Sequence, residues 1–142
     1  MEQLLQDIVA GRESAPLTII YSDMHGLWGG VTVTLSASGA YERLERKRGA
    51  GVPETIRGSV APVRVKEVVR LLIELKVCEQ YTPERAPVPD ESQATLVLRS
   101  GGAEASIWEW YNDLARNARL ARVRSRLLEL AAEANAEQGS DG

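Results

Sequence analysis

The first half of the chain alternates apolar and polar residues in the way that β-strands do. In residues 31–37, Val, Leu and Ala alternate with Thr and Ser, which is typical of a strand with one buried face. Residues 17–22 are rich in branched side chains, and residues 41–47 form a charged segment that suits the edge or the open face of a sheet. Residues 54–60 predict a further short strand. We therefore expect several antiparallel strands in this half.

Three other segments carry apolar residues at helical spacing. The first spans residues 4–9 and is followed by Gly11 at the position of a left-handed C-terminal cap. The second begins at Pro62, because a missing N–H is no loss in the first turn of a helix. Its apolar stripe consists of Val65, Val68, Val69, Leu72 and Leu75. The third is a long helix that we expect to follow Asn112 as its N-cap and to end near Ala134.

A hairpin is expected between the second and third helices. Residues 94–99 and 103–110 predict its strands, and Gly101-Gly102 indicates a tight turn between them. Residues 82–92 contain several prolines and charges, so we expect a solvated connection there rather than a domain boundary.

These elements predict an α+β fold with an antiparallel sheet of about five to six strands. Two main helices are expected on one face of the sheet, together with a short N-terminal helix. We assign residues 1–12 to an N-terminal docking helix, 13–134 to a single α+β domain and 135–142 to a flexible tail.

Composition mainly excludes functions. The chain has 142 residues and a formal net charge of −3, which suits one domain and argues against a general affinity for nucleic acid or anionic membranes. Cys78 is the only cysteine, so no internal disulfide is expected, and we predict a structural residue near the end of the second helix. The N-terminal segment has the pattern of neither a signal peptide nor a membrane span, so we expect a cytoplasmic protein.

The order of these segments resembles a known bacterial family. The matching features are the Gly29-Gly30 pair before VTVTLSASG, the charged strand YERLERKRG, the helix VKEVVRLLIEL, the strand ATLVLRSGG and a Leu-rich final helix. Over residues 17–131 the chain resembles the emfourin-like proteins, small bacterial inhibitors of thermolysin-type metallopeptidases. The resemblance implies a non-enzymatic domain that binds a protein partner.

Asp23 and His25 are the strongest candidates for chemistry. They lie in the loop SDMHGLWGG, and their alternating spacing could direct both toward one metal ion or one proton-transfer site. A metal site needs several convergent ligands, however, and the chain has a single histidine. A polar loop is the simpler interpretation. We expect no catalytic residue, no metal site and no cofactor.

Aromatic residues predict a surface for a protein partner. Trp108 and Trp110 share one face of the predicted strand, whereas Ala105 and Ile107 face the other way. If the small apolar face meets the helices, the tryptophans point outward and form a patch rich in hot-spot residues. The alternative is that a tryptophan folds over the rim of the sheet and is mostly buried. Our candidate partner-binding residues are His25, Trp28, Tyr41, Trp108 and Trp110.

The final helix places arginines before glutamates, an order that opposes the helix macrodipole and favours a partner surface. This charged surface consists of Arg116, Arg119, Arg122, Arg126, Glu129 and Glu133. Two antiparallel copies would set each basic half beside the other's acidic half, which predicts a homodimer. Such a dimer also needs apolar contacts outside the intramolecular core. They would come from Leu120, Val123, Leu127 or Leu130.

The favoured function is a non-catalytic protein-interaction module, acting as an inhibitor or regulatory partner. Its partner would be a protein of unidentified kind, with a metallopeptidase implied by the resemblance and no role for a membrane. One alternative is a nucleic-acid-associated factor that uses the Arg-rich helix, although the acidic composition argues against nucleic acid. The other is a small enzyme centred on Asp23 and His25.

Overall fold

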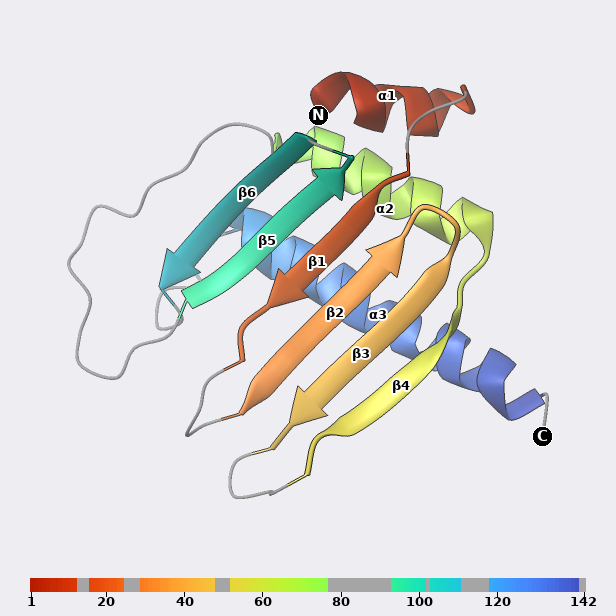
Figure 1. Cartoon of the computed structure of the whole chain (residues 1–142), viewed down its shortest axis with the longest axis vertical. Helices are drawn as coiled ribbons and strands as arrows, with labels where there is room; N and C mark the ends of the chain where they lie inside the picture. The colour runs from red at the N-terminus through yellow and green to blue at the C-terminus, as the bar shows by residue number, and fades with distance from the viewer. Residues whose placement is uncertain are drawn as a thin grey trace.

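A six-stranded antiparallel sheet forms the centre of the computed structural model, with the strand order β4-β3-β2-β1-β5-β6 (Figure 1). The strands are β1 (Thr18–Ser22), β2 (Gly30–Ser36), β3 (Ala40–Arg46), β4 (Glu54–Ser59), β5 (Gln93–Ser100) and β6 (Ala103–Trp110). The helices are α1 (Glu2–Ala10), α2 (Pro62–Glu74) and α3 (Ala118–Ser140). The structure describes residues 1–12, 16–24, 29–47, 52–76, 93–101, 103–110 and 118–140.

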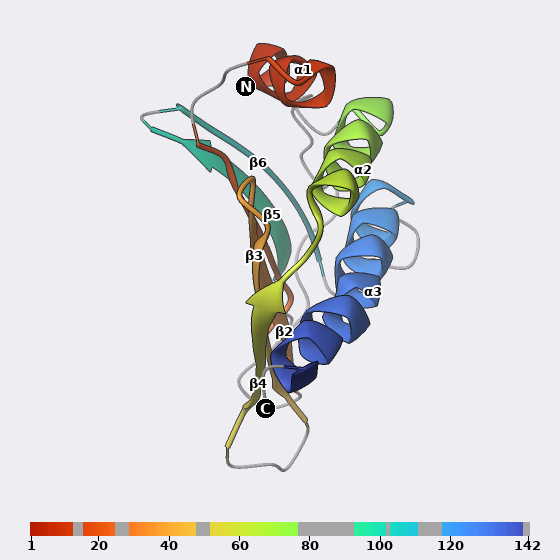
Figure 2. The same cartoon turned by 90° about the vertical axis from the view of Figure 1, so that its right-hand side faces the viewer.

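Both main helices lie on the same face of the sheet (Figure 2). The apolar stripe that the sequence predicts in α2 is buried at Val65, Val68, Val69 and Leu72. The stripe of α3 is buried at Leu120, Val123, Leu127 and Leu130. These side chains meet the buried residues of the central strands, which alternate with half-buried ones as expected. The predicted α+β fold, with its antiparallel sheet and one-sided helical layer, is confirmed.

The short helix α1 packs against α2 at one end of the sheet (Figure 2). Leu5 is its buried contact, and Gly11 ends the helix with φ 73°, the left-handed cap that the sequence predicts. The final helix reaches Ser140 instead of ending near Ala134, because Ala136, Glu137 and Gln138 are good helix formers. In the described part of the chain, no helix is long and apolar enough to cross a bilayer.

The C-terminal half of α3 lies unusually close to the sheet at β4. Gly58 makes this possible, because a Cβ there would lie 2.4 Å from the carbonyl oxygen of Ala134. Tyr41, which is paired with Gly58 across the β3–β4 ladder, donates its hydroxyl to the carbonyl oxygen of Leu127 at 2.8 Å. A glycine and a tyrosine on neighbouring strands therefore fix where α3 crosses the sheet.

Candidate interaction surface

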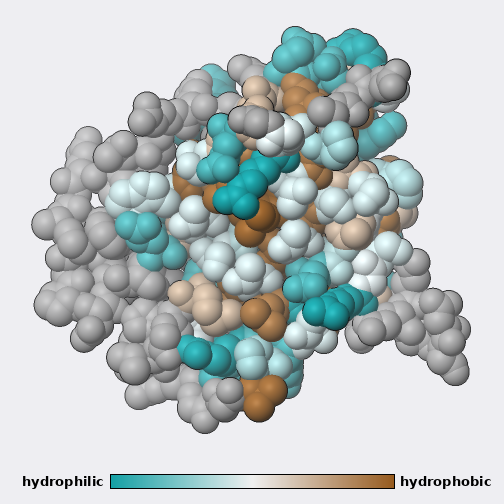
Figure 3. All heavy atoms as spheres, in the orientation of Figure 1, coloured by the Kyte–Doolittle hydropathy of each residue, from teal (hydrophilic) through white to brown (hydrophobic). Residues whose placement is uncertain are grey.

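The face of the sheet opposite the helices is rich in Ser and Thr and has a small apolar centre. Ile20 on β1 pairs with Val97 on β5, and both side chains are half-buried. Hydroxyl residues surround them, and the Ser22 and Thr32 hydroxyls are hydrogen-bonded at 2.8 Å. Figure 3 views this face and shows pale residues of intermediate hydropathy with apolar atoms between them. We call this surface the open face.

Trp108 lies on the open face, the placement that we expected if the small apolar face of its strand meets the helices. It pairs with Thr95 on β5, and its side chain is half-buried, whereas Ile107 is buried on the helix side. The predicted separation of the two faces of this strand is therefore confirmed by register and burial. The side chains of Trp110, His25 and Trp28 lie outside the described residues.

Tyr41 is not a surface residue, and our assignment of it to the partner-binding set is wrong. Its side chain is 3% exposed and points to the helices, where it bonds the backbone of α3. Burial raises the pKa of Tyr41 to about 12, because the ionised phenolate would be poorly solvated there. The residue therefore belongs to the core.

Ion pairs mark the outer strands of the open face. Arg57 on β4 pairs with Glu42 on β3 at 2.9 Å, and at the opposite side of the sheet Arg99 on β5 pairs with Glu104 on β6 at 2.9 Å. All four side chains are largely exposed, so each pair contributes only about 0–1 kcal/mol to stability. Charges at the rim and apolar residues at the centre are the usual arrangement of a protein-binding surface.

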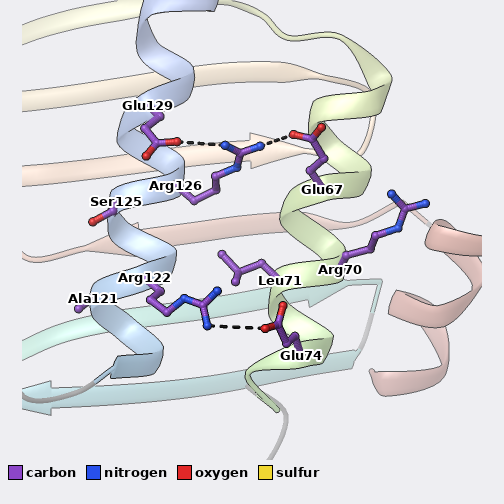
Figure 4. Close-up of a pocket in the computed structure, with 9 residues that line it drawn as sticks. All are labelled: Glu67, Arg70, Leu71, Glu74, Ala121, Arg122, Ser125, Arg126 and Glu129. Atoms are coloured by element: carbon purple, nitrogen blue, oxygen red, sulfur yellow. Dashed lines mark hydrogen bonds and ion pairs between the residues drawn. The ribbon is translucent and has the colours of Figure 1, made fainter.

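The charged surface of α3 is matched by α2 within the same chain. Figure 4 shows Arg126 lying between Glu67 of α2 and Glu129 of its own helix, and it is ion-paired to both. Further along, Arg122 is 3.7 Å from Glu74, at the C-terminal end of α2. These residues line a groove of about 570 Å³ between the helices. Two of the arginines that the sequence assigned to an outside partner, Arg122 and Arg126, therefore have partners on α2.

The acidic half of α3 is also matched by α2. Glu133 lies 3.5 Å from Arg64 and accepts a hydrogen bond from the backbone N–H of Ala61 at 3.2 Å, at the N-terminus of α2. A carboxylate is favourable at that end of a helix. The same Arg64 hydrogen-bonds Glu67 and lowers the pKa of that carboxyl group. Along each helix the paired basic residues precede the acidic ones, and because the helices are antiparallel, the basic half of α3 lies beside the acidic half of α2.

The apolar residues required for a dimer through α3 are already in the core. Leu120, Val123 and Leu127 are each 0% exposed, and Leu130 is 3% exposed. Self-association through α3 would need apolar contacts outside the core, and these four residues do not supply them. Arg119 is half-buried, and Arg116 lies outside the described residues.

Asp23 is a buried structural anchor. Its side chain is 1% exposed and accepts three hydrogen bonds, each 2.8 Å long, from the Tyr21 hydroxyl, the Val31 backbone N–H and the Arg124 guanidinium. Burial and the neighbouring negative charge raise the pKa of Tyr21. Gly30 leaves room for the carboxylate, because a Cβ there would lie 2.8 Å from it. The network ties the end of β1 to α3.

This geometry gives the Asp–His interpretation no support. Both carboxylate oxygens of Asp23 accept hydrogen bonds inside the fold, and His25 lies outside the described residues. Among the described residues, no group of His, Cys, Asp and Glu side chains could hold a metal ion.

Arg124 is the important residue that our sequence analysis did not single out. It lies one turn from both Leu120 and Leu127, so it occupies the core-facing side of the helix. An arginine in that position signals a buried acidic partner.

Comparisons with known proteins add no assignment, since no family model matches the chain and no curated protein matches its sequence.

Proposed function

We propose that this protein is a non-catalytic protein-interaction module that binds a protein partner through the open face. The observation that carries the proposal is the one-sided layering of the fold. Two helices cover one face of the sheet, and no helix or strand of the described residues covers the other (Figure 2). That face presents Trp108, Ile20 and Val97 among hydroxyl groups, within a rim of ion pairs.

The dimensions of the open face suit a protein partner. Six strands at about 4.8 Å spacing, each with about seven residues at 3.3 Å, give a face of roughly 650 Å². A stable protein complex buries about 800 Å² on each partner, so the open face would supply most of one side of such an interface. Trp108 is the candidate hot spot, because tryptophan is enriched among residues whose truncation weakens binding most.

The first partner class to test is a thermolysin-type metallopeptidase, which the emfourin-like resemblance implies. The proposed effect on this partner is inhibition, and the proposed location is the cytoplasm. The Arg-rich helix supports nucleic-acid binding poorly, because Arg122 and Arg126 are paired with carboxylates of α2. The engagement of Asp23 within the fold likewise leaves the small-enzyme alternative without a supporting observation.

The test compares the wild type with Trp108→Ala and Val97→Lys on the open face and with Arg70→Ala on α2. Binding to a purified thermolysin-type metallopeptidase is measured by calorimetry, and inhibition is measured with a peptide substrate. We expect each open-face variant to weaken binding at least roughly 10-fold, and Arg70→Ala to leave it unchanged.

If that peptidase does not bind, the same variants identify another partner. Each protein is immobilised, and proteins retained from native extract are identified by mass spectrometry. A partner retained by the wild type and by Arg70→Ala, but lost from both open-face variants, supports the proposal. Retention of the same proteins by all four would refute it.

A further inference from the structure

The two ion pairs of the open face follow a definite order of charge across the sheet. From the β4 edge, Arg57 on β4 comes first and Glu42 on β3 second. The open-face residues of β2 and β1 are uncharged, and then Arg99 on β5 and Glu104 on β6 follow. The series is therefore positive, negative, neutral, neutral, positive, negative. Because its reversal exchanges every sign, this surface is complementary to a second copy of itself turned by 180°.

The order of the strands fixes the axis of that rotation. A two-fold axis parallel to the strands, between β1 and β2, passes through the middle of the sheet. It places β4 over β6 of the partner subunit and β3 over β5 of the partner subunit. Arg57 then faces Glu104 of the partner subunit, and Glu42 faces Arg99 of the partner subunit. An axis across the strands would instead place each strand over its own copy, so that like charges would share each facing pair of strands.

The register along the strands is compatible with these contacts. Glu42 lies in the same row of the sheet as Val97, and Arg99 is two residues further along β5, so the facing ion pairs are offset by about 7 Å. Arginine and glutamate side chains together can span this offset between sheets that pack about 10 Å apart. The other arginine on this face, Arg46 at the end of β3, faces the uncharged Gln93 of the partner subunit.

We propose that the protein forms a homodimer by stacking two open faces about this axis, with both helical layers on the outside (Figure 2). Ile20 and Val97 supply the apolar centre, and four alternating charges lie on each side of it. The face of roughly 650 Å² is smaller than the 800 Å² of a stable interface, so we expect a weak dimer with a Kd of roughly 100 μM. The dimer covers the surface that the proposed function assigns to a protein partner, so the monomer would be the binding form; this last consequence alone rests on the proposed function.

Sedimentation velocity of the protein alone, from about 5 to 500 μM, tests the self-association. The wild type should change from monomer to dimer over this range. Two variants each reverse one ion pair, which keeps both the pair within the chain and the net charge. They are Glu42→Arg with Arg57→Glu, and Arg99→Glu with Glu104→Arg. Each variant alone sets like charges against each other across the axis, so its Kd should rise at least roughly 10-fold.

Two further samples restore the complementary order of charges. A protein that carries both reversals should dimerise like the wild type, and an equal mixture of the two singly reversed variants should form a heterodimer. The matched control reverses an ion pair of the helical layer, by Glu74→Arg with Arg122→Glu. It should dimerise like the wild type, because that pair lies on the other side of the sheet.

Several results would overturn the proposal. One is a wild type that stays monomeric at the highest concentration. The others are a dimer that a single reversal leaves intact, that the combined reversal fails to restore, or that the control on the helical layer abolishes. No partner protein is present in these experiments, so their outcomes are independent of the binding measurements that test the proposed function.

Discussion

Replacing Asp23 with alanine tests whether this carboxylate is structural. The substitution removes the acceptor of three hydrogen bonds. Two of the donors, the Val31 N–H and the Tyr21 hydroxyl, are buried and lose their partner, whereas the Arg124 side chain is 34% exposed and can be hydrated. A buried donor without a partner destabilises by about 1–3 kcal/mol, so the two together predict a loss of about 3–5 kcal/mol.

The assay is urea unfolding followed by circular dichroism. With a slope of about 1.5–2 kcal/mol per molar, the midpoint should fall by roughly 2 M while the slope stays unchanged. Tyr21→Phe removes only one donor and should lose about 1–2 kcal/mol. Glu42→Ala is the control, because it removes a β-strand carboxylate whose ion pair with Arg57 is exposed, and it should lose no more than about 1 kcal/mol.

A different result would change the interpretation of Asp23. Functional groups are often held at the expense of stability, so removing one can leave a protein equally or more stable. If Asp23→Ala unfolds at the wild-type midpoint or above it, the anchor interpretation is wrong. A functional role for Asp23 together with His25 would then be the better interpretation.

Three further outcomes follow from the packing of the helices and the sheet. Gly58→Ala places a Cβ 2.4 Å from the Ala134 carbonyl oxygen, so α3 must shift, and a loss of about 1–3 kcal/mol should appear as a lower Tm; an unchanged Tm would contradict it. The pKa of Tyr41 is raised to about 12 in the folded protein, whereas it is about 10 in the unfolded chain. The neutral hydroxyl therefore stabilises the fold fully below about pH 10, and this contribution is lost as the pH rises through about 12. Between pH 9 and 11 the wild type should therefore lose more stability than Tyr41→Phe, and equal losses would refute this. Glu133→Gln keeps an acceptor for the Ala61 N–H but removes the negative charge at the N-terminus of α2. In chemical denaturation, the free energy of unfolding should fall by about 0.5–1 kcal/mol in low salt and by less in high salt.

The sheet and its helical layer could be predicted because their signals are local. Residues 31–37 alternate so regularly that only one face can be buried, and Val31, Val33 and Leu35 are indeed buried. The stripe of α2 is equally regular. A period read over a few residues is sufficient for such elements, since each requires only that its apolar side meet a core.

The direction of Tyr41 could not be predicted in the same way. The strand YERLER has one large apolar residue on each face, Tyr41 on one and Leu44 on the other, so its pattern does not decide which face is buried. The contacts with Gly58 and the Leu127 backbone, which are distant in sequence, decide it.

The partners of the charges on α3 were also beyond sequence reasoning. The order of arginines and glutamates is visible in the chain, but its meaning depends on which helix lies alongside and in which direction. Antiparallel packing against α2 supplies both answers. A charge pattern that looked like an external surface is therefore satisfied inside the molecule.

The position of β1 at the centre of the sheet has a consequence for how the chain folds. The first four strands form by pairing neighbours along the chain, and so do β5 and β6, but these two units join through the β1–β5 ladder, in which Thr18 pairs with Arg99. Closing a loop of about 80 residues requires roughly 4 kcal/mol of chain entropy, so this ladder should form late. Until it does, β5, β6 and α3 can complete the first unit of another molecule as readily as their own, and refolding at high concentration would favour exchange of that segment between chains.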